Sequence, residues 1–155
     1  YAMTGWRIGY GVWPAGLTDL VTRLNINSVS CTSAATQYAA IAALAGSQES
    51  VNEMLQAFND RRRLIVDETN RIPGLSSIVP KGAFYTMPNI TGTGISSKEM
   101  ESILLEDLGV AVVAGTSFGS FGEGYMRFSY ANSSENITRA MHRIRDYAES
   151  NGWGR

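Results

Sequence analysis

The chain has 155 residues, of which 44% are hydrophobic and 17% charged, as in an ordinary folded domain. Its 13 basic and 14 acidic residues give a net charge of -1, which argues against nucleic acid or an anionic membrane as a partner. Cys31 is the single cysteine, so no internal disulfide can form, and no signal peptide or membrane span is evident. We therefore expect a cytoplasmic protein.

The first element expected is a strand over residues 6–12. Its apolar residues alternate with Arg7 and two glycines, which is the period of a strand. Positions without a side chain let another molecule approach the backbone, and a guanidinium suits a carboxylate or a phosphate. The alternative is a structural ion pair between Arg7 and a nearby carboxylate.

Three helices are expected next. Pro14 suits the first turn of a helix whose leucines repeat at helical spacing. Residues 34–45 are small and apolar almost all round, which predicts a buried helix. Ser47 as N-cap and an apolar stripe predict a long helix that ends at Pro73-Gly74. A helix of about 24 residues spans about 36 Å, so we expect it to link two structural units.

Short elements follow the long helix. Residues 76–87 predict a hairpin with its turn at 80–82. Ser96 and Glu99 form a capping box at the start of a helix, and the apolar run 110–113 predicts a buried strand after it.

The last third of the chain begins with a glycine-rich loop from Gly115 to Gly124. It precedes a strand over residues 125–130, in which Arg127 falls on the polar side. Asn132 as N-cap, with Glu135 in the first turn, predicts a final amphipathic helix. The elements together predict an α/β fold in two units.

Two other kinds of site are disfavoured. Gly115 to Gly119 matches the G-x-S-x-G pattern of the nucleophile elbow in a hydrolase. In that motif a helix directly follows the nucleophilic serine, whereas Ser117 is followed by more glycines and a strand. The only histidine, His142, lies late in a predicted helix, where we expect it to be partly exposed. One histidine and one cysteine offer no metal-ligand spacing, so no metal site is expected.

Five segments carry a resemblance to a known family: Tyr1-Ala-Met-Thr-Gly-Trp-Arg7-Ile-Gly-Tyr10, Gln37–Ala40, Lys81–Tyr85, Gly115–Gly119 and Tyr125–Ala131. They closely resemble the aspartate aminotransferase branch of the fold-type I pyridoxal-phosphate enzymes, over nearly the whole chain. The resemblance implies the end of a large cofactor-binding domain at residues 1–58, a long linking helix, and a small C-terminal α/β domain at residues 59–155. Ala114 departs from the family, which often has proline before the glycine loop.

The resemblance also implies a function. It is that of a homodimeric transaminase, which uses pyridoxal 5'-phosphate to move an amino group from an amino acid to a 2-oxo acid. Aspartate is the leading substrate, while alanine, aromatic and other amino acids stay open. Arg7 matches the family arginine that binds the cofactor phosphate, and Arg127 matches the one that binds the substrate α-carboxylate.

The family's Schiff-base lysine would lie two positions before Tyr1. Lys81 and Lys98 do not match it, and we expect both to be structural or exposed. We therefore expect no catalytic residue in this chain, a longer parent enzyme, and no activity from the chain alone. Residues 1–45 would then expose apolar surface.

The alternative is a non-catalytic α/β binding or interaction module that never held a cofactor. It accounts for the composition but not for the first ten residues.

Overall fold

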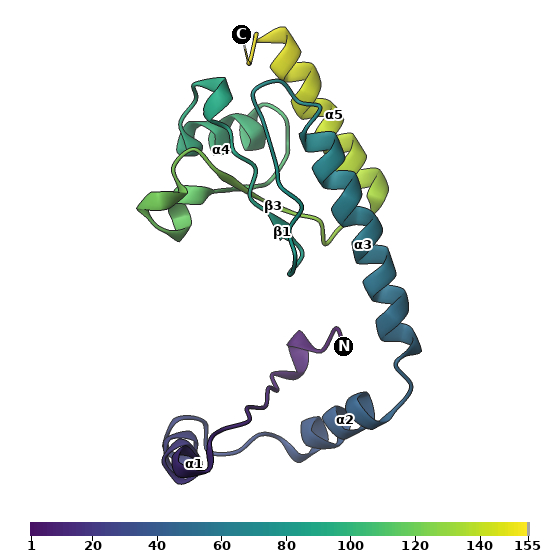
Figure 1. Ribbon diagram of the computed structural model, residues 1–155, viewed down its shortest axis with the longest axis vertical. Helices are drawn as coiled ribbons and strands as arrows, with labels where there is room; N and C mark the ends of the chain where they lie inside the picture. The colour runs from purple at the N-terminus through teal and green to yellow at the C-terminus, as the bar shows by residue number, and fades with distance from the viewer. Residues whose placement is uncertain (155) are drawn as a thin grey trace. The chain divides into compact units, whose positions relative to one another are not determined.

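The computed structural model describes residues 1–154 (Figure 1). The chain divides into a first unit, residues 1–53, and a second unit that begins at Met54. The boundary therefore falls within the long helix. No helix among the described residues is long and apolar enough to cross a membrane.

The first unit is helical. It contains the 3-10 turn η1 (Thr4–Trp6), α1 (Ala15–Val29), α2 (Ala34–Ala45) and the start of α3 (Glu49–Thr69). Pro14 directly precedes α1, and α2 has the predicted bounds. The Ser47 hydroxyl accepts a hydrogen bond from the Glu49 backbone N–H at 3.2 Å, which satisfies a donor at the start of α3.

The strand predicted over residues 6–12 is wrong. Trp6 ends η1, and Arg7 adopts a left-handed conformation with a φ of 51°. Alternation specifies a strand only where a second strand supplies partners for its backbone N–H and C=O groups. The first unit contains only helical elements, so residues 6–12 have no such partner within it.

The burial predicted for residues 34–45 is also wrong, although the helix itself is confirmed. Thr36 is the only buried residue that the structure describes in the first unit, and Tyr38 is 74% exposed. An apolar helix is buried only where another layer covers it. The exposed apolar surface expected over residues 1–45 is therefore confirmed, with Val12 at 89% and Leu24 at 66% among its side chains.

The second unit contains a three-stranded antiparallel sheet. Its strands are β1 (Tyr85–Thr86), β2 (Val113–Ala114) and β3 (Met126–Ser129), in the order β1-β3-β2. The registers place Tyr85 opposite Ser129 and Val113 opposite Arg127. The helices together with this sheet confirm the predicted α/β class.

Two of the predicted strands are shorter than expected. The hairpin of residues 76–87 is reduced to one bridge between Ser76 and Asn89, because β1 pairs with β3 instead. The run 110–113 enters the sheet only at Val113, because the Val110 N–H donates to the Leu104 carbonyl at 2.7 Å and closes the end of the preceding helix.

Two helices complete the second unit, α4 (Ser97–Glu106) and α5 (Ser134–Ser150). Ser96 caps α4 as predicted, since its hydroxyl accepts from the Glu99 N–H. Ser133, and not the predicted Asn132, caps α5. The Asn132 side-chain oxygen instead accepts from the Ser133 N–H and from the Asn136 amide, which places it one residue outside the helix.

The core lies entirely in the second unit. It takes Ile65 and Val66 from α3, Met126 and Phe128 from β3, and apolar residues from α4 and α5. The stripe predicted for α5 is confirmed, because Ile137, Met141, Ile144 and Ala148 are all buried.

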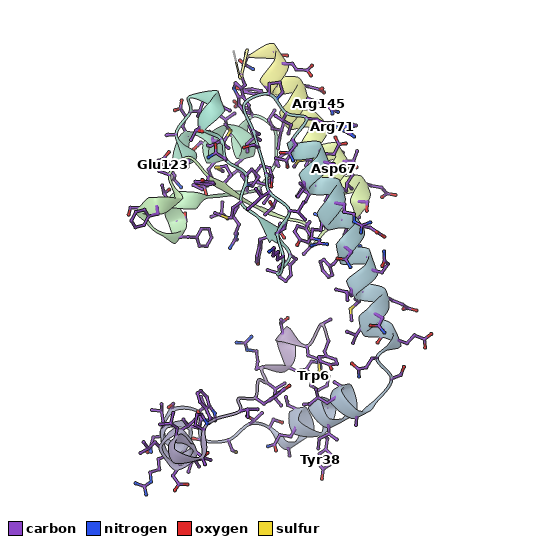
Figure 2. The ribbon with its side chains drawn as sticks, viewed as in Figure 1. Trp6, Tyr38, Asp67, Arg71, Glu123 and Arg145 are labelled. Carbon is purple, nitrogen blue, oxygen red and sulfur yellow. The ribbon has the colours of Figure 1, made fainter. Side chains whose placement is uncertain are left out.

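A buried carboxylate also joins α3 to α5. Glu68 accepts hydrogen bonds from Arg71, in the turn after α3, at 2.5 Å and from Arg145 of α5 at 3.4 Å, and Figure 2 labels these two arginines near each other. The two guanidinium groups compensate the cost of burying the charge of Glu68.

Candidate functional site

The sheet of the second unit has one buried and one open face. Successive side chains of a strand point to opposite faces, so Met126 and Phe128 of β3 are buried while Arg127 and Ser129 point to the other side. Strand register places Tyr85 on the same face as these two residues. The alternation predicted for residues 125–130 is therefore confirmed, and it puts Arg127 on the open face.

Aromatic rings hold the Arg127 guanidinium. Its Cζ atom lies 4.5 Å from the ring centroid of Tyr85 and 4.7 Å from that of Phe118. Since Tyr85 pairs with Ser129, it is the diagonal neighbour of Arg127 across the strands, within reach of a long side chain. Arg127 forms no ion pair with any residue of 1–154. Its N–H groups are thus not committed to a protein carboxylate.

The glycine-rich loop carries the second of these rings. It folds into two short turns, η3 (Gly115–Phe118) and η4 (Ser120–Gly122). These turns pack backbone to backbone, because a Cβ atom at Gly115 would lie 2.2 Å from the Gly122 carbonyl oxygen. Only glycine fits this approach, so the glycines give the loop a compact shape that places Phe118 beside Arg127.

Helix α4 holds both ends of this loop. At one end, the Glu101 carboxylate accepts a hydrogen bond from the Ala114 N–H at 2.9 Å. At the other end, the buried Ser97 hydroxyl accepts from the Gly124 N–H at 2.9 Å, and the Glu123 carboxylate accepts from the Ser97 N–H at 2.8 Å. Glu123 is labelled in Figure 2 between the loop and α4. These hydrogen bonds attach both ends of the loop to α4, and the two with a carboxylate acceptor are charge-assisted.

The pKa of Glu101 lies below its ordinary value. The hydrogen bond from Lys98 is the main cause, and the hydrogen bond from the Ala114 N–H adds to it. Both donors favour the ionised carboxylate, which therefore stays charged into acidic solution.

Arg7 lies in the first unit and is exposed. One of its guanidinium nitrogens donates to the Thr4 carbonyl at 3.0 Å, and it forms no ion pair within residues 1–154. Nothing stands within 4 Å of a Cβ placed at Gly5 or Gly9. A permanently charged donor beside open backbone fits a phosphate group. Arg7 and Arg127 belong to different units.

The other polar candidates form no catalytic set. His142 is half-exposed, as predicted, and its Nε2 lies 3.9 Å from the Glu68 carboxylate. Ser117 is exposed in η3, whereas His142 belongs to α5. Lys98 pairs with Glu101, and Lys81 is exposed, so the surface positions predicted for both lysines are confirmed.

The sequence did not reveal the partners of Arg127. Tyr85 and Phe118 stand in motifs already singled out, but their contact with Arg127 depends on strand register and on the fold of the glycine loop. The supporting roles of Ser97, Glu101 and Glu123 depend likewise on how α4 packs. Residues 83–87 and residues 125–130 each have the alternating pattern of a strand. This alternation is the sequence signal that Tyr85 and Arg127 could lie on the same face of a sheet.

Comparison with known proteins gives a consistent result. The family model described as aminotransferase class I and II matches residues 1–144. The aspartate aminotransferase of Pyrococcus horikoshii is 42% identical over 146 residues, which cover 93% of this chain and 37% of that protein. The aromatic-amino-acid aminotransferase 2 of Thermococcus litoralis is 40% identical over 146 residues, with the same shares.

The solved structures give the same picture. The aromatic aminotransferase of Pyrococcus horikoshii OT3 matches with a TM-score of 0.91 at 37% identity, over 97% of this chain and 41% of that one. The aspartate aminotransferase of Rhizobium meliloti matches with a TM-score of 0.89 at 36% identity. The chain spans about two fifths of the length of these relatives.

Proposed function

The chain belongs to the class I and II aminotransferase family, and on this basis we propose that it is part of a pyridoxal-phosphate-dependent transaminase. Such an enzyme moves an amino group between an amino acid and a 2-oxo acid. Residues 1–58, which comprise the first unit and the next five residues of α3, are assigned to the end of a large cofactor-binding domain, and residues 59–155 to a small C-terminal domain. A cytoplasmic homodimer is part of the same proposal.

The main support for the proposal is that the Arg127 guanidinium forms no ion pair within residues 1–154. Its guanidinium lies on the open face of the sheet, beside a braced glycine loop, and no carboxylate of residues 1–154 pairs with it. Both substrates of a transaminase carry an α-carboxylate. A planar guanidinium binds such a group with two parallel hydrogen bonds, which fixes its orientation as well as its position.

Arg7 is proposed to hold the phosphate of the cofactor. Its guanidinium is exposed and its neighbouring glycines leave the backbone open, which fits a bound phosphate. Pyridoxal 5'-phosphate, when bound, supplies a carbonyl group that takes up the amino group and a ring that accepts electrons. Arg7 takes no part in proton transfer, because a guanidinium does not lose its proton in proteins.

No lysine of this chain is in a position to move the substrate's proton. Lys98 is paired with Glu101, and Lys81 is exposed in a turn between α3 and β1. A lysine that moves a substrate proton must lie within hydrogen-bond reach of that proton in the binding site, and both lysines lie on the surface instead. We therefore propose that the catalytic lysine lies outside these 155 residues and that the chain alone is inactive.

Aspartate is the proposed amino acid substrate. Several of the similar proteins bear that name, while others are named for aromatic amino acids. Both kinds of substrate share the α-carboxylate that Arg127 is proposed to bind. Aspartate and phenylalanine are therefore the two amino acids to compare first.

The test uses the longer protein that contains this chain. Transamination is measured with aspartate or phenylalanine for the parent and for Arg127→Lys. Lysine keeps the positive charge but lacks the planar guanidinium that can form two parallel hydrogen bonds. We expect KM to rise by about 10- to 100-fold for the amino acid and for the 2-oxo acid, as for the loss of one charge-assisted hydrogen bond. Arg139→Gln, an exposed arginine of α5, is the control and should leave KM unchanged.

The cofactor role of Arg7 is measured separately. Arg7→Gln should weaken the binding of pyridoxal phosphate, followed by the absorbance of the bound cofactor, about 10-fold or more. If the longer protein neither binds pyridoxal phosphate nor transfers an amino group, the transaminase proposal is wrong and a non-catalytic binding module takes its place.

A further inference from the structure

We propose that Tyr85 and Phe118 are positioning residues, which hold the Arg127 guanidinium ready for a substrate carboxylate without occupying its hydrogen-bond donors. This inference rests on the proposed function and names two residues to which the sequence motifs assign no role.

Two aromatic rings lie close to the Arg127 guanidinium. Its Cζ atom lies over the Tyr85 ring at 4.5 Å and over the Phe118 ring at 4.7 Å from the centroids. Both distances are well within the 6 Å or so over which an aromatic face attracts a cation. Each contact therefore restrains where the guanidinium lies.

The two rings come from different elements of the second unit. Tyr85 belongs to β1 and Phe118 to the loop that follows β2, and these strands flank β3 on its two sides. Rings supplied from both sides of the strand limit the sideways movement of a long, flexible side chain. Arginine otherwise loses considerable rotamer freedom when it binds a ligand, so prior restraint lowers that cost.

Aromatic rings, and not a protein carboxylate, contact the Arg127 guanidinium. A protein carboxylate would bind the N–H groups of Arg127 and so compete with the carboxylate of the substrate. An aromatic face attracts the guanidinium through its π-electrons and leaves these N–H groups available. No residue of 1–154 forms an ion pair with Arg127, which agrees with this arrangement.

The backbone of the glycine loop determines where Phe118 lies. Phe118 itself is 57% exposed, so surrounding side chains do not fix it. Its position instead depends on the close backbone contact of Gly115 with Gly122 and on the hydrogen bond from Ala114 to Glu101. The folded loop thus positions the Phe118 ring.

The test replaces each ring in the longer protein. Tyr85→Leu and Phe118→Leu are measured alone and together, with whichever of aspartate and phenylalanine turns over faster. Binding is measured with the matching acid that lacks the amino group, succinate or 3-phenylpropionate. We expect KM and this Kd to rise about two- to fivefold in each single variant, and to rise further in the double variant than in either single one. The value of kcat should change less than about twofold.

Matched variants separate positioning from general damage. Tyr85→Phe keeps the ring and should behave like the parent. Phe121→Leu changes a fully exposed ring of the same loop, and it should leave KM and Kd unchanged. If a leucine variant unfolds at the assay temperature, Tyr85→Met and Phe118→Met, which fill space without an aromatic face, take its place.

Three results would overturn the inference: unchanged KM and Kd in the double variant, a fall in kcat at constant KM, or a loss in Tyr85→Phe equal to that in Tyr85→Leu. The Arg127→Lys variant shows whether only the positioning role of the rings is wrong or the proposed function is wrong as well. If Arg127→Lys raises KM and the ring variants do not, only the positioning role is wrong. If Arg127→Lys has no effect either, the carboxylate-binding role is wrong as well.

Discussion

Ala83 is one of four non-glycine residues with a positive φ in the described chain, and its φ is 58°. Two hydrogen bonds from Tyr130 lie around it: the Tyr130 hydroxyl donates to the Ala83 carbonyl and the Tyr130 N–H donates to the Phe84 carbonyl, both at 2.9 Å. The buried tyrosine thus holds the chain in a conformation that costs an alanine about 1 kcal/mol or more. The strain at Ala83 is local and can be relieved by one substitution.

Ala83→Gly should stabilise the chain by up to about 1 kcal/mol, because glycine adopts a positive φ without steric cost, although it also loses more freedom on folding. Urea unfolding measures the change. Ala111→Gly is the control, since Ala111 is exposed and is not among the residues with positive φ, and it should be neutral or destabilising. A clear loss of stability in Ala83→Gly would show that the alanine side chain contributes packing.

Glu101 makes the stability of the second unit depend on pH. Its pKa is lowered from the ordinary value of 4.5, mainly by the Lys98 hydrogen bond. Since the carboxylate is more acidic in the folded state, its contribution is present above about pH 4.5 and is lost as the pH falls through the lowered pKa. Glu101→Gln keeps an acceptor for the Ala114 N–H but carries no charge.

We expect Glu101→Gln to be less stable than the parent near neutral pH and to lose less stability on acidification. The two unfolding curves should approach each other below the lowered pKa. Urea unfolding between pH 7 and pH 2.5 measures this, with Glu106→Gln, an exposed carboxylate of the same helix, as control. Parallel curves for Glu101→Gln and the parent would show that another group carries the acid dependence.

The shape of the glycine loop depends on one close contact between backbone segments. A Cβ at Gly115 would lie 2.2 Å from the Gly122 carbonyl oxygen, and one at Gly122 would lie 2.0 Å from the Gly115 carbonyl oxygen. Both neighbours are backbone atoms and cannot rotate away, so the two turns would have to separate.

Gly115→Ala and Gly122→Ala should each destabilise the chain by about 1–3 kcal/mol. In the longer protein they should also raise KM as Phe118→Leu does, because opening the loop moves the ring that it carries. Gly82→Ala is the control: a Cβ there meets nothing within 4 Å, and its φ is not positive. Wild-type stability in both loop variants would mean that the turns tolerate separation.

The helices were easier to predict than the strands, and the difference has a physical cause. The bounds of α2 and the cap of α4 follow from short-range patterns, because a helix satisfies its hydrogen bonds within one segment. Residues 6–12 have a strand pattern but no partner strand, and Val110 is taken up by the end of α4. Strand formation depends on distant residues, which alternation alone does not identify.

The site shows the same limit. The position of Arg127 on an open strand face followed from alternation along one segment. Its contacts with Tyr85 and Phe118 join residues 42 and 9 positions away, through strand register and a folded loop. The roles of Arg7 and Arg127 came from the family resemblance and stay predictions until the variants are measured.

The two units differ in how much apolar surface they bury. Every residue of the hydrophobic core lies between Ile65 and Trp153, in the second unit. The first unit buries only Thr36 among the residues that the structure describes, and leaves apolar side chains such as Tyr10 and Tyr38 more than 70% exposed. Burial of apolar surface is the main favourable term in folding, so the second unit carries nearly all the stability of the chain.

A chain shortened to residues 47–155 keeps all of α3, the Ser47 hydrogen bond and the complete core. We expect it to unfold cooperatively, with a urea midpoint close to that of the full 155-residue chain and an extrapolated free energy of unfolding within about 10–15% of it, which is the usual uncertainty of that extrapolation. Removing residues 1–46 should also reduce self-association, since it removes the exposed apolar side chains of α1 and α2. Residues 1–46 alone should show little protection against hydrogen exchange, because they lack a buried core. A large fall in the midpoint of the shortened chain would show instead that the first unit contributes to the stability of the second, and that the units fold together.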